Sequence, residues 1–352
     1  MNRTVGIIEG EGVGREIVRA AQLCLCAVQE LRHEHLKLRL YTGRVQGADA
    51  ERELTIFYKQ MRDAGGVILR ASIPAPVCYR LRREFDLFYK LIPFRVDPAL
   101  ARFSPLKPER IRDLDLLLVR QNNQGFYHGQ FEPLDHRVRC EQYYDVTSIR
   151  RLAEVAFLQA ASRRRRLRLL MKDEVLGPLG VLWRETFSQA ALRHPEVRYD
   201  LVPPDSGSAQ ILLAPWAFDV VVAGDIEGDM LADQLAVLVH GTRAATPSVN
   251  CDDSGFASYQ TIHGTAKGLA GKNIANPAGM IVAAAWMLGR SFGWHVEAAR
   301  LRTAVFDVLS ESLTSVPTDQ HNADLVLESI GTARFAELVC ARLLSHEVRQ
   351  AA

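Results

Sequence analysis

Short apolar runs alternate along the chain with longer segments whose apolar positions recur every three to four residues. The short runs predict strands and the periodic segments predict helices. Strands are expected at Thr4–Ile8, Leu36–Tyr41, Gly66–Leu69, Leu114–Arg120, Arg168–Met171 and Phe218–Ala223. Helices are expected at Arg15–Leu31, Ala50–Ala64, Ser148–Ser162, Leu179–Leu192, Asp229–Val239, Pro277–Phe292 and His295–Leu309. This alternation predicts an α/β fold with a largely parallel sheet.

Composition narrows the class of protein. The chain has 352 residues, which predicts about two domains, and its 43 Lys and Arg nearly balance 41 Asp and Glu. The balance disfavours bulk nucleic-acid binding, and no apolar run reaches the roughly 20 residues of a membrane span. The basic run Arg163–Arg166 is interpreted as a solvated helix end. With six scattered cysteines and no secretory signal, we expect a cytoplasmic protein with reduced thiols.

The first expected strand leads into a turn with glycines at Gly10, Gly12 and Gly14. Glycines between a strand and a helix suit a dinucleotide-binding turn, but that motif has the spacing GxGxxG. A tight turn that simply needs glycine explains the pattern as well.

Acidic residues follow the expected strand Phe218–Ala223. Asp229 and Asp233 are four residues apart and therefore share one helix face. They could hold a divalent cation, or form a solvated acidic face with Asp229 in the first helical turn. Asp205 is a further oxygen ligand candidate or a helix cap.

Other candidate residues follow expected strands. Arg120 and Tyr127 lie in a polar loop, where an arginine could bind a carboxylate and a tyrosine could act as an acid. Lys172 is either a lysine that extends to solvent or a catalytic base. The small residues between His263 and Pro277 suggest a loop that approaches a ligand closely.

Taken in order, these stretches resemble the isocitrate/isopropylmalate dehydrogenase family of metal-dependent β-decarboxylating dehydrogenases, from Ile7 to about Leu338. Ile8–Glu16 resembles I-P-G-D-G-I-G-P-E, Leu81–Phe88 resembles L-R-K-x-L-D-L-Y, and Arg120–Gly129 resembles R-E-N-T-E-G-x-Y-x-G. Gly228–Asp233 resembles G-D-I-L-S-D, Pro247–Asn250 resembles P-S-A-N, and His263–Pro277 resembles H-G-S-A-P-x-x-A-G-x-x-I-A-N-P.

The resemblance implies a role for each matching residue. It implies that Asp205, Asp229 and Asp233 bind Mg²⁺ or Mn²⁺, that Lys172 is the base and that Tyr127 is the proton donor. It implies that Arg82 and Arg120 bind the substrate carboxylates and that Cys78, Tyr79 and Ile92 line the substrate pocket. The residues implied to bind the cofactor are His263, Gly264, Thr265, Ala266 and Asn276. The metal would polarise the C2–O bond of a 2-hydroxy acid, and hydride would pass to nicotinamide before CO₂ is lost.

The resemblance also implies an architecture. Residues 1–95 plus 241–352 would form a large, cofactor-binding domain that contains both termini. Residues 96–240 would form a smaller domain with the dimer contact and the metal and substrate residues. In the family, the lysine and the third aspartate enter the site from the partner subunit, which implies a homodimer with shared sites.

Departures from the family pattern concern the substrate. Ile92 replaces a carboxylate-binding arginine, and Lys90 replaces a nearby asparagine. Pro76 and Cys78 stand where isocitrate-type members have serine and asparagine, so isocitrate is disfavoured. The pocket for the C3 substituent is expected to be mostly apolar. We therefore expect a 3-substituted malate-like acid (isopropylmalate-, malate- or tartrate-like), used in a specialised biosynthetic pathway.

NAD⁺ is favoured over NADP⁺, because Gly268-Leu269 replaces the NADP-type Lys-Tyr pair and no basic cluster follows Val316–Asp319. Two alternatives stay open. Gln121, Gln260 and Glu174 replace residues of the family motifs, which suits a catalytically weak paralogue that acts as a binding or regulatory subunit. The second alternative is a 2-hydroxy acid dehydrogenase that does not decarboxylate its substrate.

Overall fold

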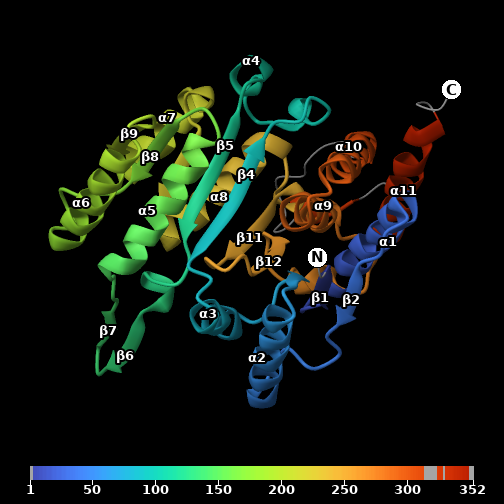
Figure 1. The fold of residues 1–352 in the computed structure, drawn as a ribbon, viewed down its shortest axis with the longest axis horizontal. Coiled ribbons are helices and arrows are strands. Elements are labelled where there is room, and N and C mark those ends of the chain that lie inside the picture. The colour runs from blue at the N-terminus through green and yellow to red at the C-terminus, as the bar shows by residue number, and fades with distance from the viewer. Residues whose placement is uncertain (1–2, 313–322, 328–329, 349–352) are drawn as a thin grey trace.

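The computed structural model describes residues 3–312, 323–327 and 330–348 and places their strands in one ten-stranded sheet and one hairpin. The sheet order is β2-β1-β3-β12-β11-β4-β5-β10-β8-β9 (Figure 1). Its strands are β1 (Thr4–Ile8), β2 (Lys37–Leu40), β3 (Val67–Arg70), β4 (Tyr89–Arg95), β5 (Asp115–Gln121), β8 (Arg166–Leu170), β9 (Arg198–Val202), β10 (Val220–Ala223), β11 (Pro247–Cys251) and β12 (Ala257–Thr261).

Helices cover both faces of this sheet (Figure 1). They are α1 (Gly14–Arg32), α2 (Ala48–Asp63), α3 (Ala75–Glu84), α4 (Pro108–Ile111), α5 (Val146–Ala161), α6 (Pro178–Arg193), α7 (Pro204–Leu213), α8 (Asp225–His240), α9 (Ala278–Phe292), α10 (His295–Ser312) and α11 (Thr332–Val348). Among the described residues, no helix is long and apolar enough to cross a membrane.

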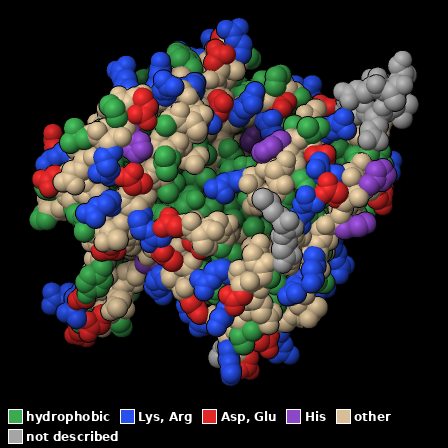
Figure 2. Space-filling view, viewed as in Figure 1, with side chains coloured by type: hydrophobic (Ala, Val, Ile, Leu, Met, Phe, Trp, Pro, Cys, Tyr) green, Lys and Arg blue, Asp and Glu red, His purple; other side chains and the backbone are tan. Residues whose placement is uncertain are grey.

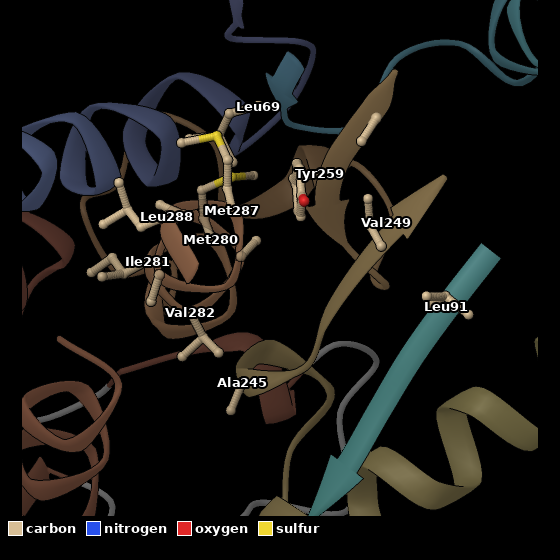
Figure 3. Close-up of a cluster of buried hydrophobic side chains, with 14 of the residues drawn as sticks. Leu69, Leu91, Ala245, Val249, Tyr259, Met280, Ile281, Val282, Met287 and Leu288 are labelled. Carbon is tan, nitrogen blue, oxygen red and sulfur yellow. The ribbon is translucent and has the colours of Figure 1, made fainter. Parts of the chain in front are cut away.

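The expected α/β class with a mostly parallel sheet is confirmed. The exceptions lie at its centre, where β4 runs antiparallel to both β5 and β11, and β11 runs antiparallel to β12. The two faces of β4 enter different cores. Leu91 belongs to the core shown in Figure 3, with Val249, Tyr259 and residues of α9, whereas Ile92 belongs to the core beneath α8.

Two local expectations were wrong. The helix expected from Asp229 begins one turn earlier, at Asp225, because Asp225 and Glu227 supply the acidic first turn that a helix N-terminus favours. Asp229 is therefore not a first-turn residue. Arg163 is not a solvated helix end, because its guanidinium binds Asp219 (2.8 Å) and Asp115 (2.7 Å). The segment after Val316 that bears on the cofactor lies outside the described residues.

Two further features matter for the function. Strands β6 (Gln130–Leu134) and β7 (Arg137–Glu141) form a hairpin that projects from the body (Figure 1), with almost every residue exposed. On the face that Figure 2 shows, a hollow with a hydrophobic floor lies near the middle of the molecule. A cavity of about 500 Å³ is lined by residues of β4, β5, α9 and α10, including Arg95, Phe306 and Arg302.

Candidate active site

The end of β5 and the second turn of α8 bring together three of the predicted residues. Arg120 is fully buried, and its Nη1 donates to Asp229 Oδ1. The other carboxylate oxygen of Asp229 accepts a hydrogen bond from the Tyr127 hydroxyl at 3.2 Å. The Arg120 guanidinium also lies 5.6 Å from the Tyr127 ring centroid. One carboxylate is thus held between a buried cation and a phenol.

This arrangement shifts the pKa of both acids. Burial, the charge of Asp229 and the hydrogen bond to it raise the pKa of Tyr127 to about 12. Burial acts to raise the pKa of Asp229, but the nearby charges of Arg120 and Lys90 outweigh it and lower that pKa. At neutral pH, Tyr127 is therefore a protonated donor and Asp229 is a carboxylate, as a proton donor and a cation ligand require.

The turn before Tyr127 depends on an acid that the sequence analysis missed. Asp225, at the start of α8, accepts a hydrogen bond from the Tyr127 backbone N–H at 2.7 Å. Gly125 adopts a φ of +107°, and a Cβ there would collide with the Asp225 carboxylate. Asp225 lies four residues before Asp229, so a search for acids on one helix face could have found it.

Helix α3 supplies the next predicted residues. Arg82 is buried, and its guanidinium lies 4.8 Å from the Tyr79 ring centroid. Tyr79 in turn contacts the Tyr127 ring, with 5.5 Å between centroids. Within the described part of the chain, no hydrogen bond or carboxylate partner is found for Arg82. It therefore remains available to an anionic ligand beside Tyr127.

The surroundings of Cys78 are more polar than the apolar pocket that the sequence predicts. Arg70 Nη2, buried at the end of β3, donates to Cys78 Sγ at 3.2 Å. Burial would raise the pKa of the thiol, but the charges of Arg82, Arg70 and Lys90 lower it to about 7. The sequence-based expectation overlooked these cations because they come from three separate elements.

Ile92, predicted to line the substrate pocket, is 0% exposed. It packs in the core beneath α8 with Leu118 and Leu231. Lys90, two residues earlier on the same face of β4, is paired in register with Arg120. The cation nearest to Arg120 on β4 is thus Lys90.

The second predicted metal ligand on α8 faces another partner. Asp233 accepts from Arg243 Nη1 at 3.3 Å, and Arg243 also binds Asp324 at 2.8 Å. Two carboxylates one helical turn apart supply the oxygen ligands that Mg²⁺ or Mn²⁺ prefers. Among the described residues, no group of three or more His, Cys, Asp or Glu could hold a metal ion. One chain therefore offers part of a cation site.

The remaining predicted pair lies apart from Asp229 and Asp233. Lys172 Nζ donates to Asp205 Oδ2 at 2.5 Å, and their side chains are 41% and 66% exposed. The hydrogen bond from Lys172 lowers the pKa of Asp205. In the single chain, Lys172 thus extends to solvent, which is one of the two alternatives that the sequence left open.

The predicted cofactor residues meet the glycine turn. Val13 N–H donates to the Thr265 carbonyl at 3.0 Å, and a Cβ at Gly12 would collide with that carbonyl. Gly264 and Thr265 line a cavity of about 600 Å³ with Glu11, Ser72 and Val77. Ala266 adopts a left-handed backbone with φ of +43°. The glycines thus serve a close approach between two loops, as the turn interpretation held.

His263 and Asn276 are both buried and each keeps an unsatisfied polar atom. His263 Nδ1 lies 3.0 Å from the Gly264 carbonyl, while Nε2 has no partner. Asn276 Oδ1 accepts from Ala278 N–H at 3.0 Å, while Nδ2 has no partner. Burial lowers the pKa of His263. A neutral imidazole and a free amide N–H suit the polar edge of an adenosine.

The sheet order and the helices on both faces define an α/β fold, and comparison with known proteins identifies the class of enzyme. The family model for isocitrate/isopropylmalate dehydrogenase matches residues 4–339. The chain is 31% identical to 3-isopropylmalate dehydrogenase of Nitrosomonas europaea, over 97% of this chain and 99% of the relative. It is 32% identical to 3-isopropylmalate dehydrogenase of Hahella chejuensis, over 98% of this chain and 99% of the relative.

Solved structures agree. Isocitrate dehydrogenase from Methylococcus capsulatus superposes with a TM-score of 0.80 at 25% identity, over 97% of this chain and 99% of the other. The chain belongs to the isocitrate/isopropylmalate dehydrogenase family. It is accordingly an oxidoreductase, a decarboxylating hydroxy-acid dehydrogenase.

Proposed function

We propose that the protein catalyses the NAD⁺-dependent and divalent-metal-dependent oxidative decarboxylation of a 3-substituted malate-like 2-hydroxy acid. The observation that carries the proposal is the convergence of the buried Arg120 with Asp229 and Tyr127, with the buried Arg82 beside them. A cationic pocket next to a carboxylate and a protonated phenol suits an anionic 2-hydroxy acid that must be bound, oxidised and then protonated.

The proposal gives each of these residues a step in the reaction. Arg82 and Arg120 bind substrate carboxylates, and Asp229 and Asp233 hold Mg²⁺ or Mn²⁺, whose chemistry is to polarise the C2–O bond. Lys172 would take the proton of the substrate hydroxyl, and bound NAD⁺ would supply the hydride acceptor. Tyr127, kept protonated by its raised pKa, gives a proton to the carbon that has lost CO₂. His263 and Asn276 bind the adenosine end of NAD⁺ through their unsatisfied nitrogens.

We propose further that two copies complete each site. Lys172 and Asp205 then come from the partner subunit to meet Asp229 and Asp233. Exposed apolar side chains support a covered face around these residues: Val175 (70% exposed) near Lys172, Met230 (62%) next to Asp229, and Phe131 (51%) on the hairpin. The division at residues 95 and 240 and a location in the cytoplasm belong to the same proposal.

The test is turnover of NAD⁺ with a panel of 3-substituted malates in the presence of Mg²⁺ or Mn²⁺, with CO₂ measured as a product. We expect NADH and CO₂ in equal amounts, and loss of both after chelation. NADH without CO₂ would replace the proposal with a non-decarboxylating dehydrogenase.

One observation favours a second candidate function, a regulatory or binding subunit. Ile92 is uncharged and enclosed in the core, so this position supplies no cation to bind a substrate carboxylate. Binding of malates by a well-folded protein that reduces no NAD⁺ under any of these conditions would favour this candidate over the first.

A further inference from the structure

Lys90 is a buried lysine whose charge has no partner among the described residues. It lies on β4, next to Arg120 on β5 and Asn250 on β11 in the strand registers, and it is 3% exposed. Within the described part of the chain, no hydrogen bond or ion pair is found for its ammonium group, and only the more distant charges of its neighbours act on it. Asn250 donates through Nδ2 to the Ser258 carbonyl, and its Oδ1 accepts from Asn122, so it is engaged elsewhere.

Two cations and two acids act on Lys90. Arg120 and Arg82 repel it, while Asp229 and Cys78 attract it, and with burial the net effect is a pKa well below the usual value for lysine. Asp229 already binds Arg120 and Tyr127. Cys78 already accepts from Arg70. No carboxylate in this cluster is therefore left for Lys90.

A buried cation without a partner destabilises a fold, so such groups persist mainly where a ligand supplies the missing charge. Arg82, Lys90 and Arg120 carry three positive charges against the single carboxylate of Asp229, which leaves a surplus of two. A dianion matches that surplus. A divalent cation would add two positive charges, and two carboxylates would supply the negative charge beside it: Asp205 and Asp233, which pair with Lys172 and Arg243 in the single chain.

We propose that Lys90 is a substrate-binding residue that grips one carboxylate of a dianionic 2-hydroxy acid. This inference rests on the proposed function and deepens it. It places the third carboxylate-binding cation two residues before Ile92, on the same face of β4. It also limits the substrate, because the two carboxylates of the malate core use the whole surplus. The group at C3 is then uncharged.

The test compares Lys90→Met with the wild type in two measurements that need no turnover. Malonate, a dianion, and acetate, a monoanion, serve as probes in thermal-shift titrations at constant ionic strength. We expect Lys90→Met to weaken malonate binding roughly 10- to 100-fold, as loss of a charge-assisted hydrogen bond does. Acetate binding should change far less. Lys37→Met, at an exposed position of β2, is the matched control and should change neither malonate binding nor acetate binding.

The ligand-free melting temperature separates a binding role from a structural one. If Lys90 is held for substrate, Lys90→Met relieves charge repulsion and the protein melts at the same or a higher temperature. If Lys90 is structural, the variant melts earlier. An earlier melting transition, or malonate affinity within threefold of the wild type, would overturn the proposal.

Turnover supplies the last comparison and keeps the two proposals distinct. In Lys90→Met, the KM for the 2-hydroxy acid should rise while the KM for NAD⁺ stays unchanged, and Lys90→Arg should recover part of the loss. Selective use of malates with a charged C3 group would contradict the inference about Lys90 but leave the dehydrogenase assignment intact. Failure of the wild type to reduce NAD⁺ would contradict the assignment alone, because malonate binding still tests Lys90.

Discussion

Two acid–cation pairs of this protein carry residues predicted for one site, yet their surroundings differ sharply. Arg120 and Asp229 pair near the centre of the sheet, where the arginine side chain is 2% exposed and the aspartate side chain is 47% exposed. Lys172 and Asp205 pair on the surface, with side chains 41% and 66% exposed. An ion pair on the surface contributes little to stability, whereas breaking a buried one leaves a costly unpaired charge.

The difference teaches which part of the site a single chain can prepare. The Arg120–Asp229 pair is fixed by β5, α8 and the Tyr127 hydroxyl, so its geometry exists before any ligand arrives. The Lys172–Asp205 pair has no such enclosure. We infer that it gains its function only when a second copy covers it.

The largest expected effect comes from the buried pair. Asp229→Asn should lower kcat by about 1000-fold or more, because it removes a cation ligand and leaves Arg120 without its carboxylate. Steady-state NADH formation measures the loss. Asp113→Asn, at an exposed acid, is the control and should keep full activity. An Asp229→Asn enzyme within tenfold of the wild type would remove this pair from the site.

The exposed pair should matter for turnover but not for folding. Lys172→Met is expected to lower kcat about 100- to 1000-fold, as loss of a general base does, with an unchanged unfolding midpoint. The exposure of Lys172 predicts the unchanged unfolding midpoint, and its proposed role as a base predicts the loss of kcat. Circular dichroism melts and NADH formation measure them.

Mixing the two inactive variants tests where Lys172 acts. A heterodimer of Asp229→Asn and Lys172→Met keeps one intact site if the lysine crosses to the partner subunit. Unfolding and refolding the mixture should then restore about a quarter of wild-type activity, since half of the dimers are mixed and each has one good site. No recovery would mean that both residues serve the same chain's site.

A smaller effect, on stability, should follow from the turn that orients Tyr127. Gly125→Ala places a methyl group against Asp225 at a φ of +107°, and we expect a loss of about 1–3 kcal/mol from backbone strain plus the cost of the collision. Gly255→Ala is the control, because φ is +91° there and nothing lies within 4 Å of the added carbon. Denaturant unfolding should show the larger loss for Gly125→Ala. Equal losses would mean that Asp225 does not support the turn.

The smallest effect concerns pH. Burial and the charge of Arg82 lower the pKa of His128 to about 4, against an unfolded value near 6.5. Between these values the unfolded chain binds more protons, so His128 makes stability fall as pH decreases from about 6.5 to 4. His128→Gln should flatten that slope in urea unfolding measured across this window. His136→Gln, at a 93% exposed side chain, should leave the slope as it is.

The sequence predicted the regular elements better than the centre of the sheet. Thr4–Ile8 was predicted with its observed bounds, and the helix expected at Pro277–Phe292 begins one residue later, because continuous apolar runs and long periodic segments show local structure directly. Strand β4 was missed. It contains Pro93 and the buried Lys90, and neither is typical of a central strand.

The site shows the same limit. Individual motifs pointed to Arg120, Tyr127, Asp229 and His263, and the structure places the first three in contact. The link between Gly125 and Asp225 spans 100 positions and follows no local pattern. The cations around Cys78 come from β3, α3 and β4, so only the folded chain reveals them together.

The unbroken sheet has a mechanical consequence. Because hydrogen-bonded strands join one edge to the other, a change in the twist of the sheet would move its two ends relative to each other, as in a torsion spring. Points near the axis of a twisting body travel least. Lys90 and Arg120 lie on β4 and β5 near the middle of the strand order, whereas Lys172 follows β8, next to the edge strand β9. A change in twist would therefore displace Lys172 more than Lys90 and Arg120.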